Sequence, residues 1–370
     1  YPTDLSTVTR INNPFGPPVP VQPMTTAQLI ADNPSILGGS FQNQTPYYET
    51  WTMSIERQLN SSTLLEVAYA GSRGVHLLYA YNPQEVEPGP SSVPSSQRVT
   101  IPAIASLRSI TQEDPRNMSN YHGAQVTLTR RFSGGLQFLA SYTWSKSLDY
   151  GGSAASGGGA VGNPQTITDL QAGYGPSGFD APQRFVGSWT WEIPVGPGKR
   201  WLKHGVLSNV VGNWQLGGIA TLQSGLPFTV HLANCVNNAS SCWPDRIGSG
   251  ATANQSFSHW YDPSAFAAPC AVALVNGTCS QYAYRFGNSG RGILRAPNLF
   301  DLDLSAVKNV AIRERIQMQL RLDAFNALNH PDMGFPNQNI SPADPAATST
   351  AITSTIGDNR DLQVSLSLTF

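Results

Sequence analysis

Charge is scarce in this sequence. Among 370 residues, 22 are Lys or Arg and 23 are Asp or Glu, which gives a charged fraction of 12% and a net charge of −1. This fraction is about half of that in an ordinary soluble domain. A chain so close to neutral offers no basic surface for nucleic acid, so nucleic acid is excluded as a partner. Its polarity comes from Ser, Thr, Asn and Gln instead.

Long apolar runs are also missing. No stretch of about 18 apolar residues occurs, which excludes a transmembrane helix but not a membrane protein built of strands. The chain has no starting Met and no signal peptide, and residues 1–47 have the composition of a loop. We expect 1–47 to be an irregular extracellular segment, and 48–370 to be the C-terminal portion of a larger fold.

Motifs that carry catalytic or metal chemistry are absent. The serine motif GxSxG does not occur, and GGSAASGGG at 151–159 lacks the flanking strand and helix of a phosphate-binding loop. The histidines show no HExxH or CxxC partner spacing, so we expect no metal site, no cofactor and no enzymatic activity. These histidines are His76, His122, His204, His231, His259 and His330.

The last ten residues, DLQVSLSLTF, alternate strictly between apolar and polar side chains. Such alternation is typical of a strand with one apolar and one polar face. The length fits the roughly 9 to 11 residues of a transmembrane β-strand. The apolar face consists of Leu362, Val364, Leu366, Leu368 and Phe370.

Further segments have the same character, and together they predict about nine strands. An edge strand of a soluble sandwich produces the same alternation, so this pattern alone leaves two fold classes open. The nine segments are 48–59, 62–81, 120–132, 135–147, 183–193, 213–230, 298–309, 314–326 and 361–370.

The connections alternate between short and long. Tight turns at 60–61, 133–134 and 310–313 alternate with long connections at 82–119, 148–182, 231–297 and 327–360. This rhythm is typical of outer-membrane barrels, which have short periplasmic turns and longer extracellular loops. The link at 194–212 is too long for the rhythm, so we expect a short helix or an elaborated turn there.

Nine strands leave an open edge, which a closed single-chain barrel does not have. We therefore predict an all-β, antiparallel transmembrane β-barrel of which this chain supplies the C-terminal part. Large barrels with a plugged lumen reach about 22 strands.

Several blocks resemble the C-terminal barrel of Oar-like TonB-dependent receptors. The blocks include NYHGAQVTLTRRFSGGLQFLASYTWSKSLD, DAPQRFVGSWTWEIPVGPGKRW and FGNSGRGILRAPNLFDLDLSAVKN, and they occur in order up to Phe370. The resemblance implies a Gram-negative outer-membrane receptor for energy-coupled transport of a solute such as a carbohydrate, a peptide or a siderophore-like molecule. It also implies that the TonB complex acts through an N-terminal plug region, and that the barrel-assembly machinery reads the last strand.

Four cysteines lie in the longest extracellular connection, 231–297. An even number of cysteines in one loop of an exported chain predicts two disulfides. Of the three pairings, the short local ones are favoured, Cys235 with Cys242 and Cys270 with Cys279. Aromatic residues around them could stack on a ligand or pack the loop onto itself; these are Trp243, Trp260, Tyr261, Phe266, Tyr282 and Tyr284.

The few charges in the strands form one cluster. Asp301 and Asp303 alternate with apolar residues, as do Arg321 and Asp323 on the next segment, so all four should face the lumen. Pairing around a turn at 310–313 would place Arg321 opposite or diagonal to Asp301 or Asp303. We expect a structural ion pair there rather than catalysis.

Two other functions fit parts of this pattern. A secreted β-sandwich or carbohydrate-binding module would bury the apolar faces against each other. A passive porin-like channel would have a self-sufficient, even number of strands and no plug.

Overall fold

The computed structural model describes Thr25 and residues 36–39, 44–102, 110–151, 161–236, 239, 242–276, 279–313 and 316–370. Most of the segment 1–47, and the glycine-rich loop at 151–159 apart from Gly151, therefore lie outside the described residues. Among the described residues, no helix is long and apolar enough to cross a membrane.

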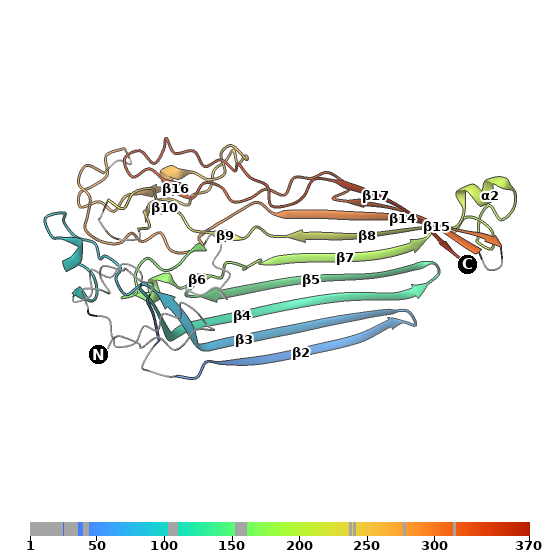
Figure 1. Cartoon of the computed structure of the whole chain (residues 1–370), viewed down its shortest axis with the longest axis horizontal. Helices are drawn as coiled ribbons and strands as arrows, with labels where there is room; N and C mark the ends of the chain where they lie inside the picture. Colours follow the sequence, from blue (N-terminus) through green and yellow to red (C-terminus); the bar gives the residue numbers. More distant parts are fainter. Residues whose placement is uncertain are drawn as a thin grey trace, which may run out of the picture.

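Most strands of the described chain belong to one sheet of eleven strands, nine of which follow each other in the order β17-β15-β14-β8-β7-β5-β4-β3-β2. Neighbours along this path are antiparallel. Figure 1 shows these long strands side by side. Their bounds are Tyr47–Asn60 (β2), Thr63–Tyr81 (β3), Ile110–Ser133 (β4), Leu136–Asp149 (β5), Gln183–Glu192 (β7), Trp214–Gln223 (β8), Leu299–Arg313 (β14), Ile316–Phe325 (β15) and Asp361–Thr369 (β17).

The register places apolar side chains on one face across the whole sheet. Directly paired residues share a face, and these pairs include Leu366 with Leu320, Val126 with Tyr142, and Val67 with Ile55. The opposite face carries pairs such as Thr127 with Ser141 and Gln363 with Asp323. We call the first the outer face and the second the inner face.

No second layer covers the outer face in the described part of the chain. Leu362 and Val364 are each 68% exposed, and Leu366 is 63% exposed. A sandwich would bury these side chains between two stacked sheets. The sandwich alternative is therefore wrong, and the fold is the expected all-β barrel wall of about nine strands, with its sheet left open.

The two ends of the sheet differ in the length of their connections (Figure 1). The turns from β2 to β3 and from β4 to β5 lie at the end that holds the C-terminus, together with the link 193–213. The other long connections lie at the opposite end. Since barrels have short periplasmic turns, the end with the C-terminus is the periplasmic end. The long connections then form the outer loops.

The link at 193–213 contains a short helix, α2, Val206–Val211, which was one of the two alternatives that its length predicted. Three strand boundaries differ from the prediction by more than two residues. β4 begins at Ile110, ten residues early, and β8 ends at Gln223, seven residues early. β14 continues to Arg313, so the four residues 310–313 belong to the strand in place of the expected turn. Arg313 pairs with Ile316, the first residue of β15.

Short strands occupy the outer loops. Ile36–Gly39 (β1) pairs with β4, and Gly175–Pro176 (β6) pairs with β5. The other pairs are Pro227–Phe228 (β9) with Leu294–Arg295 (β13), His231–Leu232 (β10) with Asn339–Ile340 (β16), and Asp245–Arg246 (β11) with Phe266–Ala267 (β12).

Candidate ligand-binding loops and inner face

The two longest outer loops share a small hydrophobic core. The parallel pair β10 and β16 joins the loop 224–298 to the loop 326–360. Around it, Phe228, Phe266 and Ile340 are fully buried. This packing makes the outer loops an ordered layer over the strand ends.

The predicted ligand aromatics fall into two groups. Trp243, Tyr261 and Phe266 are buried, and Tyr261 donates a hydrogen bond of 2.9 Å from its hydroxyl to the Asn337 carbonyl. Of the two alternatives for these aromatics, Trp243, Tyr261 and Phe266 follow the second and pack the loop onto itself, because a loop this long needs its own apolar core.

The remaining aromatic candidates keep some exposure. Tyr284 is 54% exposed, and Trp260 and Tyr282 are partly exposed. Trp260 stacks on the exposed Phe257 with ring centroids 6.3 Å apart. These side chains remain candidates for contact with a ligand.

Both cysteine pairs are bonded in the favoured local pairing. Cys235 joins Cys242 with Cα atoms 5.5 Å apart, and Cys270 joins Cys279 with Cα atoms 5.6 Å apart. The first disulfide belongs to the loop core, where Cys242 is buried. The second closes the hairpin in which Cys270 pairs with Tyr282.

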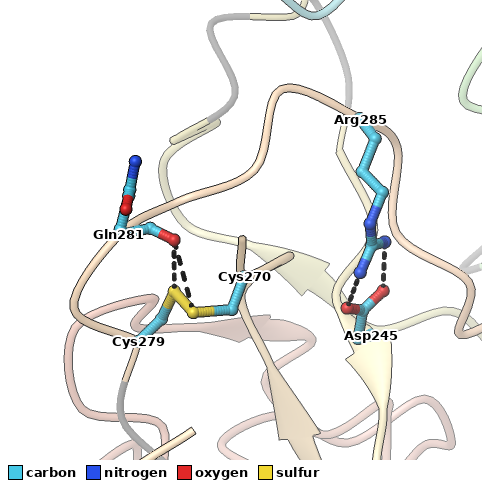
Figure 2. Close-up of a disulfide and its surroundings, with 5 residues drawn as sticks. All are labelled: Asp245, Cys270, Cys279, Gln281 and Arg285. Carbon is cyan, nitrogen blue, oxygen red and sulfur yellow. Dashed lines mark hydrogen bonds and ion pairs between the residues drawn. A yellow bond between two sulfur atoms is a disulfide. The ribbon is translucent and has the colours of Figure 1, made fainter. Parts of the chain in front are cut away.

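Figure 2 shows this second disulfide and its surroundings. The Gln281 carbonyl oxygen lies 3.3 Å from Sγ of Cys270 and 3.2 Å from Sγ of Cys279. Nearby, Arg285 donates two hydrogen bonds of 2.8 and 2.5 Å to the carboxylate of Asp245. This pair raises the pKa of Arg285 above its ordinary value and ties the end of the hairpin to β11.

A buried ion pair joins the start of the loop 150–182 to the end of the loop 224–298. The Arg291 side chain is fully buried, and its guanidinium lies 2.5 Å from Oδ1 of Asp149, the last residue of β5. It also donates hydrogen bonds to the carbonyls of Gly173 and Gly175. Burial lowers the pKa of Arg291 and the Asp149 carboxylate raises it, with burial the larger effect.

A second buried carboxylate has the same role. Asp180 is fully buried and accepts from Arg295 at 2.5 Å, from Lys146 at 3.3 Å and from the backbone N–H of Ser147 at 2.6 Å. It therefore fixes the return of the chain into β7 against both β5 and the strand β13.

Burial also acts on a carboxylate between the two N-terminal outer loops. Glu85 accepts the backbone N–H of Ile167 at 3.2 Å, and Glu87 accepts the hydroxyls of Thr166 and Thr168. Burial, opposed by the Ile167 hydrogen bond and aided by the nearby Glu87 charge, raises the pKa of Glu85 to about 7. These contacts attach the loop 82–102 to the loop 161–182.

The four charges of the predicted lumen cluster lie on the inner face, but their pairing differs from the prediction. Arg321 lies opposite Val307, not opposite Asp301 or Asp303, and it binds Asp323 two residues away on its own strand at 2.9 and 2.8 Å. The predicted register was wrong because β14 and β15 stay paired as far as Arg313 with Ile316, where the prediction placed a turn at 310–313.

A hollow of about 560 Å³ is lined by three of these four residues, Asp303, Arg321 and Asp323. It is lined by polar side chains together with the exposed apolar Leu139, Ile219 and Phe325. A second hollow of about 560 Å³ lies nearer the outer loops, and its lining includes Asp301, Asp303, Asp332, Asp358 and Asp361 and no basic residue.

Two of these aspartates have backbone partners. Asp303 accepts the N–H of Asn326 and Asp332 accepts the N–H of Phe300, each at 3.0 Å. Both carboxylates therefore hold the start of the loop 326–360.

The buried ion pairs were missed at the sequence level. Asp149 and Arg295 end β5 and β13, whereas Asp180 and Arg291 precede β7 and β13. Their order along the chain gives no spacing that links them. Charge was the one signal in the sequence that could have pointed to them. Charged residues are only 12% of this chain, and each of these four lies near the end of a strand.

A family model for the outer membrane beta barrel domain matches residues 1–363. No curated protein matches the chain. Among solved structures, Pseudomonas aeruginosa FpvA in complex with a heterologous pyoverdine is 13% identical over 87% of this chain and 27% of its own, with a TM-score of 0.40. The outer membrane transporter YddB from Escherichia coli is 7% identical over 90% of this chain and 34% of its own, with a TM-score of 0.45.

The FrpB iron transporter from Neisseria meningitidis is 9% identical over 90% of this chain and 32% of its own, with a TM-score of 0.40. The chain thus spans 27% to 34% of the length of these three structures. With the family model covering nearly every residue, the chain belongs to the family of outer membrane β-barrel domains and is a protein of the outer membrane.

Proposed function

We propose that this chain forms part of the pore wall and the outer recognition loops of a TonB-dependent receptor that takes up a solute in an energy-coupled way. Its sequence blocks resemble Oar-like receptors of this class along nearly the whole chain. The role is one of transport and recognition, and it involves no catalytic residue.

The open sheet carries this proposal. β2 and β17 stand at the two ends of the strand path, and each pairs on one side only within the described residues. Hydrocarbon cannot satisfy the free N–H and C=O groups of such edges, so further strands must close the wall. A barrel with many more than nine strands has a lumen wide enough to need a plug.

The outer loops supply the recognition surface in this proposal. Their disulfides, shared core and buried ion pairs hold them in one arrangement, which lowers the entropic cost of binding a ligand. Tyr284, with Trp260 and Tyr282, is the side-chain group best placed to contact a carbohydrate, a peptide or a siderophore-like solute.

Two partners follow from the same proposal. The TonB complex would act through the plug region of the complete receptor, and the barrel-assembly machinery would read the final strand. The apolar side chains of β17 are exposed at the end of the sheet, and Phe370 is 95% exposed, so the assembly machinery could bind them.

A swelling assay on the full-length protein in liposomes separates this function from that of a passive porin. A plugged receptor should give no swelling with small sugars, and the protein should bind the C-terminal domain of TonB in a pull-down. Rapid swelling without TonB binding would overturn the proposal and favour the porin-like channel.

A further inference from the structure

The helix α2 exposes its apolar side chains and buries a polar one. Its large apolar side chains point away from the protein, with Val206 81% exposed and Leu207 and Val210 each 62% exposed. The small polar Ser208 is fully buried. A short helix in water buries its apolar side and exposes its polar side, so this arrangement fits a surrounding medium that is not water.

Backbone contacts hold α2 in this orientation. The N–H of Gly212 donates to the Ser208 carbonyl at 2.9 Å, and the N–H of Asn213 donates to the Val195 carbonyl at 3.2 Å. A Cβ on Gly212 would lie 2.5 Å from Cα of Gly196, so the two glycines allow the helix end to pack closely on the preceding turn. The apolar exposure therefore belongs to an ordered element.

The helix lies on the outer face of the wall. Nζ of Lys308 donates to the carbonyls of Val210 and Gly212 at 2.7 and 2.9 Å. Lys308 pairs with Leu320 on one side and Trp214 on the other, in the apolar register of the sheet. The last turn of α2 is thus anchored to outer-face residues, and Figure 1 shows α2 at the end that holds the C-terminus.

The residues before α2 add a tryptophan and basic side chains. Trp201 is 54% exposed, and the Arg200 guanidinium lies 5.7 Å from its ring centroid. Arg200 and Lys203 are exposed and have no acidic partner among the described residues, whereas Lys199 binds Glu192 at 2.5 Å. Tryptophan and basic residues beside an apolar helix are typical of a membrane interface.

We propose that residues 200–211 form a lipid-binding element at the periplasmic surface of the outer membrane. The apolar side chains of α2 enter the boundary of the acyl chains, and Arg200 and Lys203 bind the phosphate groups of anionic phospholipid. The occupant is lipid rather than protein because this surface continues the apolar outer face of the barrel wall.

Spin labels on the full-length protein in phospholipid bilayers test the insertion. A label at Leu207→Cys should collide more with oxygen than with a water-soluble nickel complex, and a label at Ser61→Cys, in the short turn after β2, should show the reverse. Greater access of the nickel complex at position 207 would overturn the proposal. Dipolar broadening between labels of two copies would overturn it as well, because it would show a protein in contact with α2.

Lipid retention tests the basic side chains. In native mass spectrometry of the full-length protein released from bilayers with phosphatidylglycerol, Lys203→Gln and Arg200→Gln should each lower the affinity for this lipid by about fivefold. The matched variant Lys199→Gln should not change it, because that ammonium group is already bound to Glu192. Equal retention in all variants, or loss only with Lys199→Gln, would contradict the assignment.

Discussion

At the scale of the residue, side chains one position apart meet different media. Leu128 lies on the outer face, where it pairs with Leu65 and Ala140. Gln125 lies on the inner face, where it pairs with Thr143. A charge on the outer face near the bilayer midplane is expensive, and a charge in the lumen is tolerated.

We therefore expect Leu128→Arg to cost roughly 2 to 4 kcal/mol of folding free energy in bilayers, and Gln125→Arg to be nearly silent. The urea midpoint of unfolding of each full-length variant in vesicles, compared with that of the unchanged protein, measures both losses. Equal losses at the two positions would contradict the assignment of the faces.

The buried Arg291 offers a second residue-scale prediction. Replacing it by Met leaves the Asp149 carboxylate buried without its partner, so Arg291→Met should cost about 3 to 5 kcal/mol in the local stability of the outer loops. The matched variant Arg285→Met removes an ion pair with Asp245 that is 48% exposed on the arginine side, and it should cost less than about 1 kcal/mol.

Limited proteolysis of the outer loops measures this difference. The double variant Arg291→Met with Asp149→Leu should recover part of the loss, because no uncompensated charge then remains. Equal cleavage of the loops in Arg285→Met and Arg291→Met would contradict this prediction. It would show that burial does not make the Arg291 ion pair more stabilising than the exposed one.

Single residues also show where sequence reasoning succeeds. Alternation predicted the inner face of Asp301, Asp303, Arg321 and Asp323, because side chains in a strand change face at every residue. It did not predict the partner of Arg321. A partner depends on the position of the turn, and β14 and β15 keep the pattern of strands through 313 without a glycine or proline that would mark the bend.

At the scale of the element, the disulfides restrain loops that are poor in regular structure. Closing the short segment between Cys270 and Cys279 should stabilise the hairpin tip by roughly 2 to 3 kcal/mol. Cys270→Ser with Cys279→Ser should therefore increase protease cleavage near the tip and leave the loop core intact. Cys235→Ser with Cys242→Ser should open the core too, because Cys242 is buried within it.

Mass mapping of the cleavage sites distinguishes the two variants. Cleavage spread evenly through the loop 224–298 in both would show that the two disulfides do not act on separate parts of it.

The attachment between the loops 82–102 and 161–182 should depend on pH. The pKa of Glu85 is raised by burial from 4.5 to about 7, so the folded state binds the proton more tightly than the unfolded state. The contribution of Glu85 to stability is then fully present below pH 4.5 and is lost as the pH rises through 7. Because Glu85 is only partly buried, we expect this loss of folding free energy to be about 2 kcal/mol.

Hydrogen exchange at the Ile167 amide, corrected for the intrinsic pH dependence, measures this change. Protection should fall between pH 5 and 8, and Glu85→Gln should remove most of the dependence. Protection that rises with pH, or an unchanged dependence in Glu85→Gln, would speak against a proton held by Glu85.

The elements also mark the limit of prediction from sequence. The membrane-spanning parts of the strands were predicted because lipid imposes a regular apolar pattern on them. The first ten residues of β4, ITQEDPRNMS, were missed since they lie beyond the predicted membrane span, where nothing requires alternation. β8 was predicted too long because Leu226 and Phe228 continue the apolar pattern, although Gly225 closely approaches the Ala296 carbonyl and the chain turns into the loop core there.

At the scale of the whole molecule, the medium that covers the outer face decides whether this sheet is a membrane wall. The family assignment places the chain in the outer membrane, and the register gives the sheet one apolar and one polar side. The hairpin strand β5 tests this arrangement well, because Leu139 is apolar but lies on the inner face opposite Ser188.

The most direct measurement is carbene labelling of the full-length protein from a photoactivatable lipid, mapped along β5 by mass spectrometry. We expect label on Phe138, Ala140, Tyr142 and Trp144, and none on Leu139 or its polar neighbours on the inner face. Label on Leu139 at the level of Phe138, or no label on either face, would contradict the claim that hydrocarbon covers the outer face.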